Sequence, residues 1–350
     1  MQPGAAARVL VSAALPLLQR LPPETAHELG LRGLGLLRRC WKAPERDGPA
    51  VQLFGRRFAN PVGLAAGFDK NGDYVDALGA LGFGHIEVGT VTPRPQPGNP
   101  PPRLFRLRKS GALINRMGFN NKGADYVAER LQRASWPGIR GVSIGKNADT
   151  PLEQAPQDYV ACARKLYAVA DYFAVNVSSP NTQGLRQLQA AEALAGVLGP
   201  LRQECLQLQQ QHQRRVPLLV KISPDLEEHE LHDVCEVLPR QGIDGVIATN
   251  SSTRIPGFEA ELGARHKEGN SGGLSGAPLA DKSLEVLRRL RRALGAEFPI
   301  ISVGGLMSAD DVVARLLAGA NLVQLYTGFV YRGPALLADT LQRLNPPPRR

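Results

Sequence analysis

The segment NVSSPNTQGLR, residues 176–186, gathers more hydrogen-bonding side chains than a simple connection needs. It overlaps the apolar run YFAVNV and places Ser178, Ser179, Pro180 and Asn181 directly after it. One capping side chain is enough where a strand leads into a helix. The segment is therefore either an unusually polar turn or a ligand-binding loop. A serine hydroxyl in such a loop could act as a base if its surroundings activate it.

Seven other apolar runs also have small or polar residues at or next to their ends, and segments with a helical pattern separate the runs. The eight runs lie at 62–68, 85–91, 141–147, 172–178, 217–223, 245–250, 299–305 and 322–328. The helical patterns lie at 71–80, 121–134, 155–170, 187–213, 226–239, 281–294, 309–318 and 334–343. Continuous apolar runs are typical of parallel strands buried on both faces. The alternation predicts an α/β fold, a (β/α)8 TIM barrel. A doubly wound open sheet is the alternative, but no GxGxxG follows the first run.

Active sites of such barrels lie at the C-terminal ends of the strands, so the last residues of each run would meet at one rim. These residues are mostly amides, hydroxyls, lysines and glycines: Lys70, Thr90, Asn147, Asn176, Ser178, Ser179, Lys221, Ser223, Thr249, Asn250, Gly304, Gly305, Tyr326, Thr327 and Gly328. Each alone is typical of a strand end or a turn. Together they favour a polar, anionic ligand.

The last two runs add a phosphate-binding pattern. Gly304 and Gly305 precede Ser308, a candidate helix N-cap with Asp311 three residues later, and NSGGLSG (270–276) is a glycine-rich loop ahead of another helix. In barrels, a phosphate often binds the backbone N–H groups after strands 7 and 8. The pattern predicts a mononucleotide such as FMN rather than a dinucleotide.

Charge and composition limit the partners. The net charge is +10, but aromatic residues make up only 5% and no basic run is interleaved with them, so we expect no nucleic acid. An acidic lipid surface or an anionic small molecule remains. Cys40, Cys162, Cys205 and Cys235 are scattered, and no HExxH-like pattern occurs, so we expect free thiols and no metal site.

Residues 1–45 predict a helical extension ahead of a barrel over 46–345. VLVSAALPLLQRL and PPETAHELGLRGLGLLRR predict two helices, the second with a wide apolar face. The first run is shorter than the ~20 residues of a membrane span, and it contains Arg8 and Pro16. Two interpretations stay open: a hairpin docked on the barrel, or a hairpin lying on a membrane surface.

Long motifs, in order, resemble one family. NPVGLAAGFDKNG, GTVTPRPQPGNPPPRLFRL, LINRMGFNNKG, NVSSPNTQGLR, VKISPD, GVIATN, SGGLSG, SVGG and LVQLYTGF are similar to those of the dihydroorotate dehydrogenases, and more narrowly of the membrane-associated, quinone-dependent class. The resemblance runs from about residue 22 to about residue 335. It implies oxidation of dihydroorotate to orotate in pyrimidine synthesis, with FMN taking a hydride and a membrane quinone reoxidising the flavin.

The resemblance assigns roles to residues. Ser179 matches the family's base, with Thr182 and Phe119 shaping a proton relay, and Lys70 would stabilise negative charge. The substrate-binding positions it implies are Lys70, Asn115, Arg116, Met117, Gly118, Phe119, Asn176, Asn181, Asn250 and Ser251, the last standing where relatives often have threonine. The FMN-binding positions are Ala66, Gly67, Lys70, Thr90, Ser143, Asn176, Lys221, Thr249, Gly276, Gly305, Tyr326 and Thr327. Ser143 stands where relatives often have asparagine, and serine has the shorter side chain.

The resemblance also implies a peripheral membrane protein. We expect a monomer on the cytoplasmic side of the cell membrane, with the N-terminal helices forming the quinone entry. Three rival interpretations remain: an FMN barrel oxidoreductase acting on a related pyrimidine, a Schiff-base lyase that uses Lys221, and a membrane-surface binding protein built on a barrel.

Overall fold

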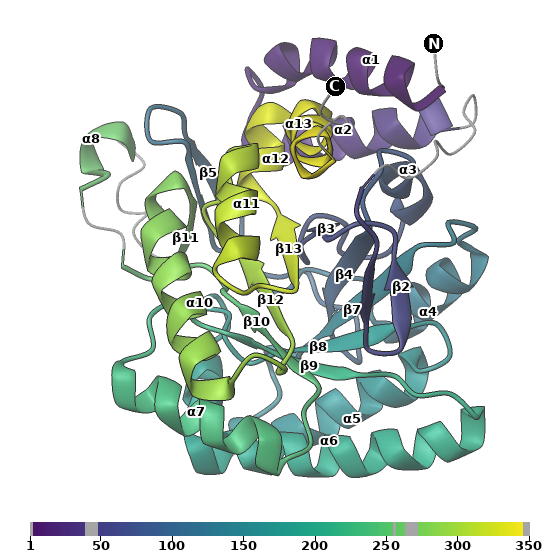
Figure 1. The fold of residues 1–350 in the computed structure, drawn as a ribbon, viewed down its shortest axis with the longest axis vertical. Coiled ribbons are helices and arrows are strands. Elements are labelled where there is room, and N and C mark those ends of the chain that lie inside the picture. The colour runs from purple at the N-terminus through teal and green to yellow at the C-terminus, as the bar shows by residue number, and fades with distance from the viewer. Residues whose placement is uncertain (1–2, 39–47, 255–256, 263–271, 346–350) are drawn as a thin grey trace.

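The structure, a computed structural model, describes residues 3–38, 48–254, 257–262 and 272–345. Its centre is a closed barrel of eight parallel strands in the order β10-β12-β13-β3-β4-β7-β8-β9 (Figure 1). The strands are β3 (Val62–Leu64), β4 (His85–Val91), β7 (Ile139–Ile144), β8 (Tyr172–Asn176), β9 (Leu218–Ile222), β10 (Gly245–Ala248), β12 (Ile300–Val303) and β13 (Leu322–Leu325). Each falls in or overlaps one predicted run, so the (β/α)8 barrel is confirmed and the open sheet is wrong.

Helices follow the strands and cover the outside of the barrel. They are α3 (Val75–Gly79), α4 (Ala124–Arg133), α5 (Ala155–Leu166), α6 (Ala191–His212), α7 (Glu228–Arg240), α10 (Ala280–Leu294), α11 (Ala309–Leu317), α12 (Thr327–Arg332) and α13 (Pro334–Leu344). Outward apolar side chains of the strands pack with the helices in one cluster, and inward ones form a second cluster inside the barrel. This is why the strands are apolar on both faces. Every predicted helical segment contains a helix, and α12 is an addition.

The N-terminal residues form two helices, α1 (Pro3–Leu18) and α2 (Pro23–Arg38). They pack on each other, α1 against α12 and α13, and α2 against α3 (Figure 1). Both predicted helices are therefore confirmed, and the hairpin is docked on the barrel. Among the described residues, no helix has the length and apolar character to cross a membrane.

Two small antiparallel sheets were not expected from the sequence. The hairpin β1 (Val51–Leu53) and β2 (Arg56–Phe58) packs against the apolar cluster inside the barrel. The second sheet, in the order β11-β6-β5, joins β5 (Leu104–Leu107) and β6 (Ala112–Asn115) to β11 (Gly273–Gly276). The predicted glycine-rich loop at 270–276 thus forms strand β11 over its described part. A short helix, α8 (Glu259–Leu262), precedes it.

Some expectations lie outside the described residues. Cys40, residues 346–350 of the tail and the boundary between residues 45 and 46 belong to these. Cys162, Cys205 and Cys235 are buried free thiols, as the sequence predicted.

Candidate active site

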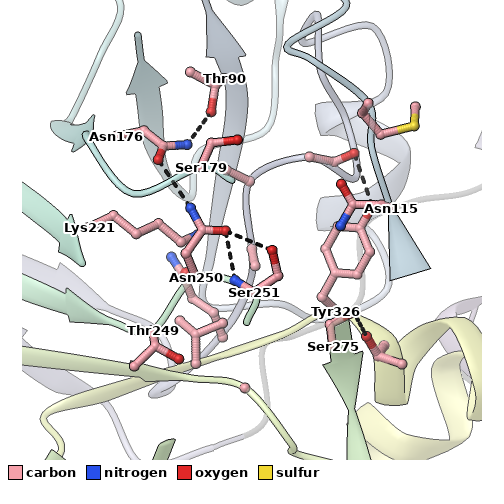
Figure 2. A pocket seen from close by; sticks show the side chains of 18 of the residues that line it. Thr90, Asn115, Asn176, Ser179, Lys221, Thr249, Asn250, Ser251, Ser275 and Tyr326 are labelled. Atoms are coloured by element: carbon pink, nitrogen blue, oxygen red, sulfur yellow. Dashed lines mark hydrogen bonds between the residues drawn. The ribbon is translucent and has the colours of Figure 1, made fainter. Parts of the chain in front are cut away.

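A cavity opens at the C-terminal ends of the barrel strands and holds about 1020 Å³, counted to its open mouth. Strands β6 and β11 of the antiparallel sheet add Asn115, Ser275 and Gly276 to its wall. Other strand ends contribute the residues labelled in Figure 2, among them Ser179 and Lys221. The residues predicted at the rim therefore line this cavity, except for Asn147, Ser178 and Ser223.

Asparagine side chains from the ends of two strands and from two loops lie around this cavity (Figure 2). The Asn250 amide donates to Asn176 Oδ1 (3.1 Å), and the Asn176 amide donates to Thr90 Oγ1 (2.8 Å). Opposite them, the Asn181 amide donates to Asn115 Oδ1 (2.9 Å). These bonds fix the orientation of each amide, which is what recognition of a planar polar ligand requires.

The serine loop is held in place by its neighbours. Ser178 Oγ donates to the carbonyl of Lys221 (2.6 Å), so this hydroxyl is committed to the fold. Arg186, later in the same motif, donates to the carbonyls of Ser178 (3.1 Å) and Ser251 (2.7 Å) and to Asp225 (2.8 Å). The guanidinium thus ties the loop after β8 to the loops after β9 and β10.

Ser179 has fewer partners than Ser178. It is 5% exposed and lines the cavity. Within the described residues, its Oγ has one hydrogen bond, from the N–H of Asn181 at 3.3 Å. A hydroxyl that faces a cavity with its proton uncommitted is able to exchange that proton with a ligand.

Two lysines bring positive charge to the cavity. Lys70 Nζ donates to the carbonyl of Gly67 (2.9 Å), and burial, the largest cause, lowers the pKa of Lys70 to about 8. Lys221 Nζ lies 3.6 Å from the fully buried Glu87. An anionic ligand would favour the charged form of Lys70.

Glu87 lies beneath the floor of the cavity. Its carboxylate accepts hydrogen bonds from Tyr172 (3.0 Å) and from Gln324 (2.8 Å), and it is the counter-charge of Lys221. A buried charge needs such partners, because desolvation is otherwise costly. Glu87 and Gln324 received no role from the sequence, although each is a polar residue inside an apolar run and could have been noticed there.

Three glycines from different segments line the cavity: Gly276 at the end of β11, Gly305 in the loop after β12 and Gly328 in the first turn of α12. A Cβ on Gly305 would lie 2.2 Å from Ala280 Cα, so only glycine lets the loop after β12 approach the start of α10 this closely. Thr327 Oγ1 donates to Ser275 Oγ (2.9 Å). Ser308 caps α11 and forms a capping box with Asp311, which confirms that prediction.

Most of the predicted site residues line this one cavity. They are Ala66, Gly67, Lys70, Thr90, Asn115, Met117, Gly118, Phe119, Asn176, Ser179, Asn181, Lys221, Thr249, Asn250, Ser251, Gly276, Gly305, Tyr326 and Thr327. Their individual roles stay predictions. The cavity also reaches Asn120, Ser275 and Gln324, which had not been named.

Three residues to which the resemblance assigned roles, Arg116, Ser143 and Thr182, do not lie on the cavity wall. The Arg116 guanidinium turns outward and donates to the carbonyl of Pro102 (2.9 and 2.8 Å). Ser143 is fully buried behind Thr90, with the two hydroxyl oxygens 2.9 Å apart. Ser143 therefore supports Thr90 instead of facing the cavity. Thr182, predicted for the relay, is buried and its hydroxyl has no partner among the described residues.

A second cavity, of about 1140 Å³ with its mouth, lies between the N-terminal hairpin and the barrel. Its wall is mainly apolar and includes Leu18 of α1, Leu34 of α2 and Phe329 of α12. Tyr326 lines both this cavity and the polar one. The hairpin thus encloses an apolar space that ends next to the polar site.

Comparison with known proteins gives one consistent result. The family model described as dihydroorotate dehydrogenase matches residues 49–346. A relative named dihydroorotate dehydrogenase (quinone), from Cellvibrio japonicus, is 51% identical over 329 residues, 92% of this chain and 94% of the relative. One of the same name from Alkalilimnicola ehrlichii is 50% identical over 339 residues, 95% of this chain and 98% of the relative.

A solved structure agrees with these sequence matches. The ligand-free dihydroorotate dehydrogenase (DHODH) of Eimeria tenella superposes with a TM-score of 0.83 at 38% identity, covering 92% of this chain and 94% of that one. Barrel, hairpin and sequence therefore agree, and the chain belongs to the dihydroorotate dehydrogenase family.

Proposed function

We propose that this protein oxidises (S)-dihydroorotate to orotate in de novo pyrimidine (UMP) biosynthesis, with FMN as hydride acceptor and a membrane quinone as final electron acceptor. The observation that carries the proposal is the pair of cavities that share Tyr326. The polar cavity suits an anionic heterocycle, and the apolar one suits a quinone with a hydrocarbon tail. The names of the relatives support the same activity.

The polar cavity has groups that suit a flavin. Thr249 Oγ1 is buried on its wall and has no hydrogen-bond partner in the described structure, and the Lys221 ammonium lies nearby. These two side chains, with Thr90 and the loops at Gly276 and Gly305, would hold FMN. When bound, FMN accepts two electrons as a hydride and passes them on to the quinone, which no amino-acid side chain can do.

Dehydrogenation of the substrate removes a proton from one carbon and a hydride from its neighbour. Ser179 Oγ would take the proton, because it faces the cavity with one hydrogen bond. The amides of Asn115, Asn181 and Asn250 would fix the ring, and Lys70 would pair with the substrate carboxylate. A site built from such bonds discriminates strongly against analogues that lack the polar groups.

The apolar cavity offers a small number of polar groups for a quinone carbonyl. Arg106 lines it, and its buried Nε has no partner among the described residues. Burial, with a smaller contribution from the charge of Lys70, lowers the pKa of His27 to about 3. The imidazole is therefore neutral at physiological pH, which suits an apolar ligand.

The hairpin would also attach the protein to a membrane. Val9, Leu17, Leu29 and Leu36 are exposed on α1 and α2, and the chain carries a net charge of +10 that favours anionic lipid. We propose a peripheral monomer on the cytoplasmic side of the cell membrane. Flotation of the purified protein with phosphatidylglycerol vesicles tests the attachment, and protein that stays at the bottom of the gradient would contradict it.

The visible spectrum of the purified protein tests the proposed activity. A yellow protein should bleach on anaerobic addition of dihydroorotate and recolour when a long-chain quinone is added. A yellow protein that does not bleach would remove dihydroorotate as the substrate. A colourless protein that takes up no flavin would contradict the oxidoreductase, and trapping with borohydride and a carbonyl compound would then test Lys221 as a Schiff-base lysine.

A further inference from the structure

The loop after β12, with Gly304 and Gly305, and the start of α10 at Ala280 form the proposed phosphate cradle. We infer that Arg315 is the positioning residue of this cradle. It is a buried cation that orients the backbone N–H groups of the cradle and makes the site prefer a phosphorylated flavin. The inference rests on the proposed use of FMN. Arg315 lies on α11, outside the barrel wall, and it does not line the cavity. Nothing in the resemblance or in the cavity wall therefore assigns it a role.

Arg315 joins the two loops that form the cradle. One nitrogen, Nη2, donates to the carbonyls of Ala280 (2.6 Å) and Gly304 (2.9 Å) and lies 2.7 Å from Ser283 Oγ. The other, Nη1, donates to Ser302 Oγ (3.3 Å). Ala280 begins α10 and Gly304 is the first residue after β12, so one guanidinium fixes the spacing of both segments.

The contact with Gly304 sets the direction of the next N–H. The C=O and N–H of one trans peptide point in opposite directions. Because the Gly304 carbonyl points to Arg315, the N–H of Gly305 points away from Arg315, and Gly305 lines the cavity. Gly305 adopts a φ of +75°, and its loop is in close contact with Ala280. Such N–H groups are the usual ligands of a phosphate.

No carboxylate of the described residues forms an ion pair with Arg315, and Asp311 and Asp281 act on its charge only from a greater distance. The residue is 2% exposed, and no carboxylate in the described part of the chain lies within 4.0 Å of its guanidinium. Asp311, one turn earlier, accepts the N–H groups of Met307 and Ser308, and Asp281 is exposed. Burial lowers the pKa of Arg315 to about 10, so it stays charged at physiological pH. A buried cation behind a cradle of N–H groups favours a dianion.

Arg291 provides a matched control at the other end of the barrel. Its guanidinium also binds backbone carbonyls, those of Gly319 (2.6 and 3.1 Å) and Phe298 (2.8 Å), and the side chain of Asn321 (3.1 Å). These contacts surround the start of β12, whereas Arg315 lies near its end. Loss of Arg291 should disturb the fold to a similar degree without touching the cradle.

The test compares FMN with riboflavin, which lacks the phosphate. Full-length protein is stripped of flavin and titrated with each, and binding is followed by flavin fluorescence. Arg315→Met should weaken FMN binding by about tenfold, equal to ~1.4 kcal/mol, because the Gly305 N–H loses its fixed direction and the buried positive charge is removed. Riboflavin binding should change much less. Arg315→Lys keeps the positive charge but not the planar guanidinium that bonds several acceptors at once. It should show a smaller loss of the FMN preference.

The outcomes separate positioning from general stability. Arg291→Met should lower the melting temperature and keep the wild-type ratio of FMN to riboflavin affinity. An unchanged ratio in Arg315→Met, or an equal fall in Arg291→Met, would overturn the inference. If Arg315→Met does not fold, Arg315→Lys decides, because an unchanged ratio there contradicts a positioning role. A wild-type protein that binds no FMN would instead overturn the proposed function.

Discussion

Ser179 differs from its neighbour Ser178 in what its hydroxyl is free to do. Ser178 Oγ donates to the fold, whereas Ser179 Oγ accepts one backbone N–H and keeps its proton available. A donated N–H lowers the cost of negative charge on the oxygen. In the described residues, no histidine or carboxylate forms a hydrogen bond with Ser179. The proton must therefore leave through the cavity or through buried hydroxyls such as that of Thr182.

Replacement of this hydroxyl should separate chemistry from cofactor binding. Ser179→Ala should retain flavin and slow flavin reduction by dihydroorotate by about 10²–10⁴-fold, the usual contribution of a general base. Anaerobic stopped-flow measurement of flavin bleaching gives this rate. Ser178→Ala is the matched control and should lose far less. Rapid bleaching in Ser179→Ala would contradict the assignment of the base.

At this scale the sequence predicted well where residues stand at strand ends. Asn176, Lys221 and Thr249 were expected at one rim and line one cavity. The prediction was wrong where a side chain points away from the cavity: Arg116 points outward, and Ser143 lies behind Thr90. Supporting residues such as Arg186, Glu87 and Arg315 act through contacts between distant segments, which no local pattern contains.

The helices and strands also divide into those that a local sequence pattern predicts and those that depend on contacts between distant segments. All eight barrel strands were visible as apolar runs, because burial on both faces leaves a continuous pattern. The sheet β11-β6-β5 was not expected, because β6 and β11 pair across more than 150 positions of the chain, which no local pattern predicts. The hairpin α1–α2 was predicted as helices, but its second role, enclosing a cavity against Phe329, depends on docking.

A single glycine tests the role of the hairpin. Gly33 lies on α2 and lines the apolar cavity, and a Cβ there would meet nothing within 4 Å. Gly33→Phe should fill the cavity while leaving bleaching by dihydroorotate intact. The KM for a long-chain quinone should rise by about tenfold or more, equal to ~1.4 kcal/mol. Steady-state assays with quinone and stopped-flow bleaching measure the two steps separately.

Gly196 on α6 is the matched control, since it also has open space around it but lies exposed on another helix. Gly196→Phe should change neither rate. If Gly33→Phe leaves the quinone kinetics as they are, the quinone does not use the cavity between hairpin and barrel.

For the whole molecule, burial of titratable groups links stability to pH. His85 is fully buried under the barrel, with Phe58 and Tyr172 beside its ring, and burial lowers its pKa to about 3. The pKa of this histidine in the unfolded chain is 6.5. The stability that burial of the neutral ring contributes is therefore complete above pH 6.5 and is lost as the pH falls from there towards 3. Asp69 acts oppositely, because burial raises its pKa to about 6 and stability is lost as the pH rises through that value.

His85→Phe isolates one of these contributions. Neither ring nitrogen of His85 has a hydrogen-bond partner in the described structure, so phenylalanine replaces it without a lost bond. Between pH 7 and pH 5 the wild type should lose ~2 kcal/mol more stability than this variant, because it must keep His85 unprotonated. Urea unfolding at both pH values measures the difference. His229→Phe, at an exposed position on α7, is the control for the exchange of one histidine for phenylalanine. Equal pH dependence in His85→Phe and wild type would mean that the barrel interior accommodates the charged imidazole.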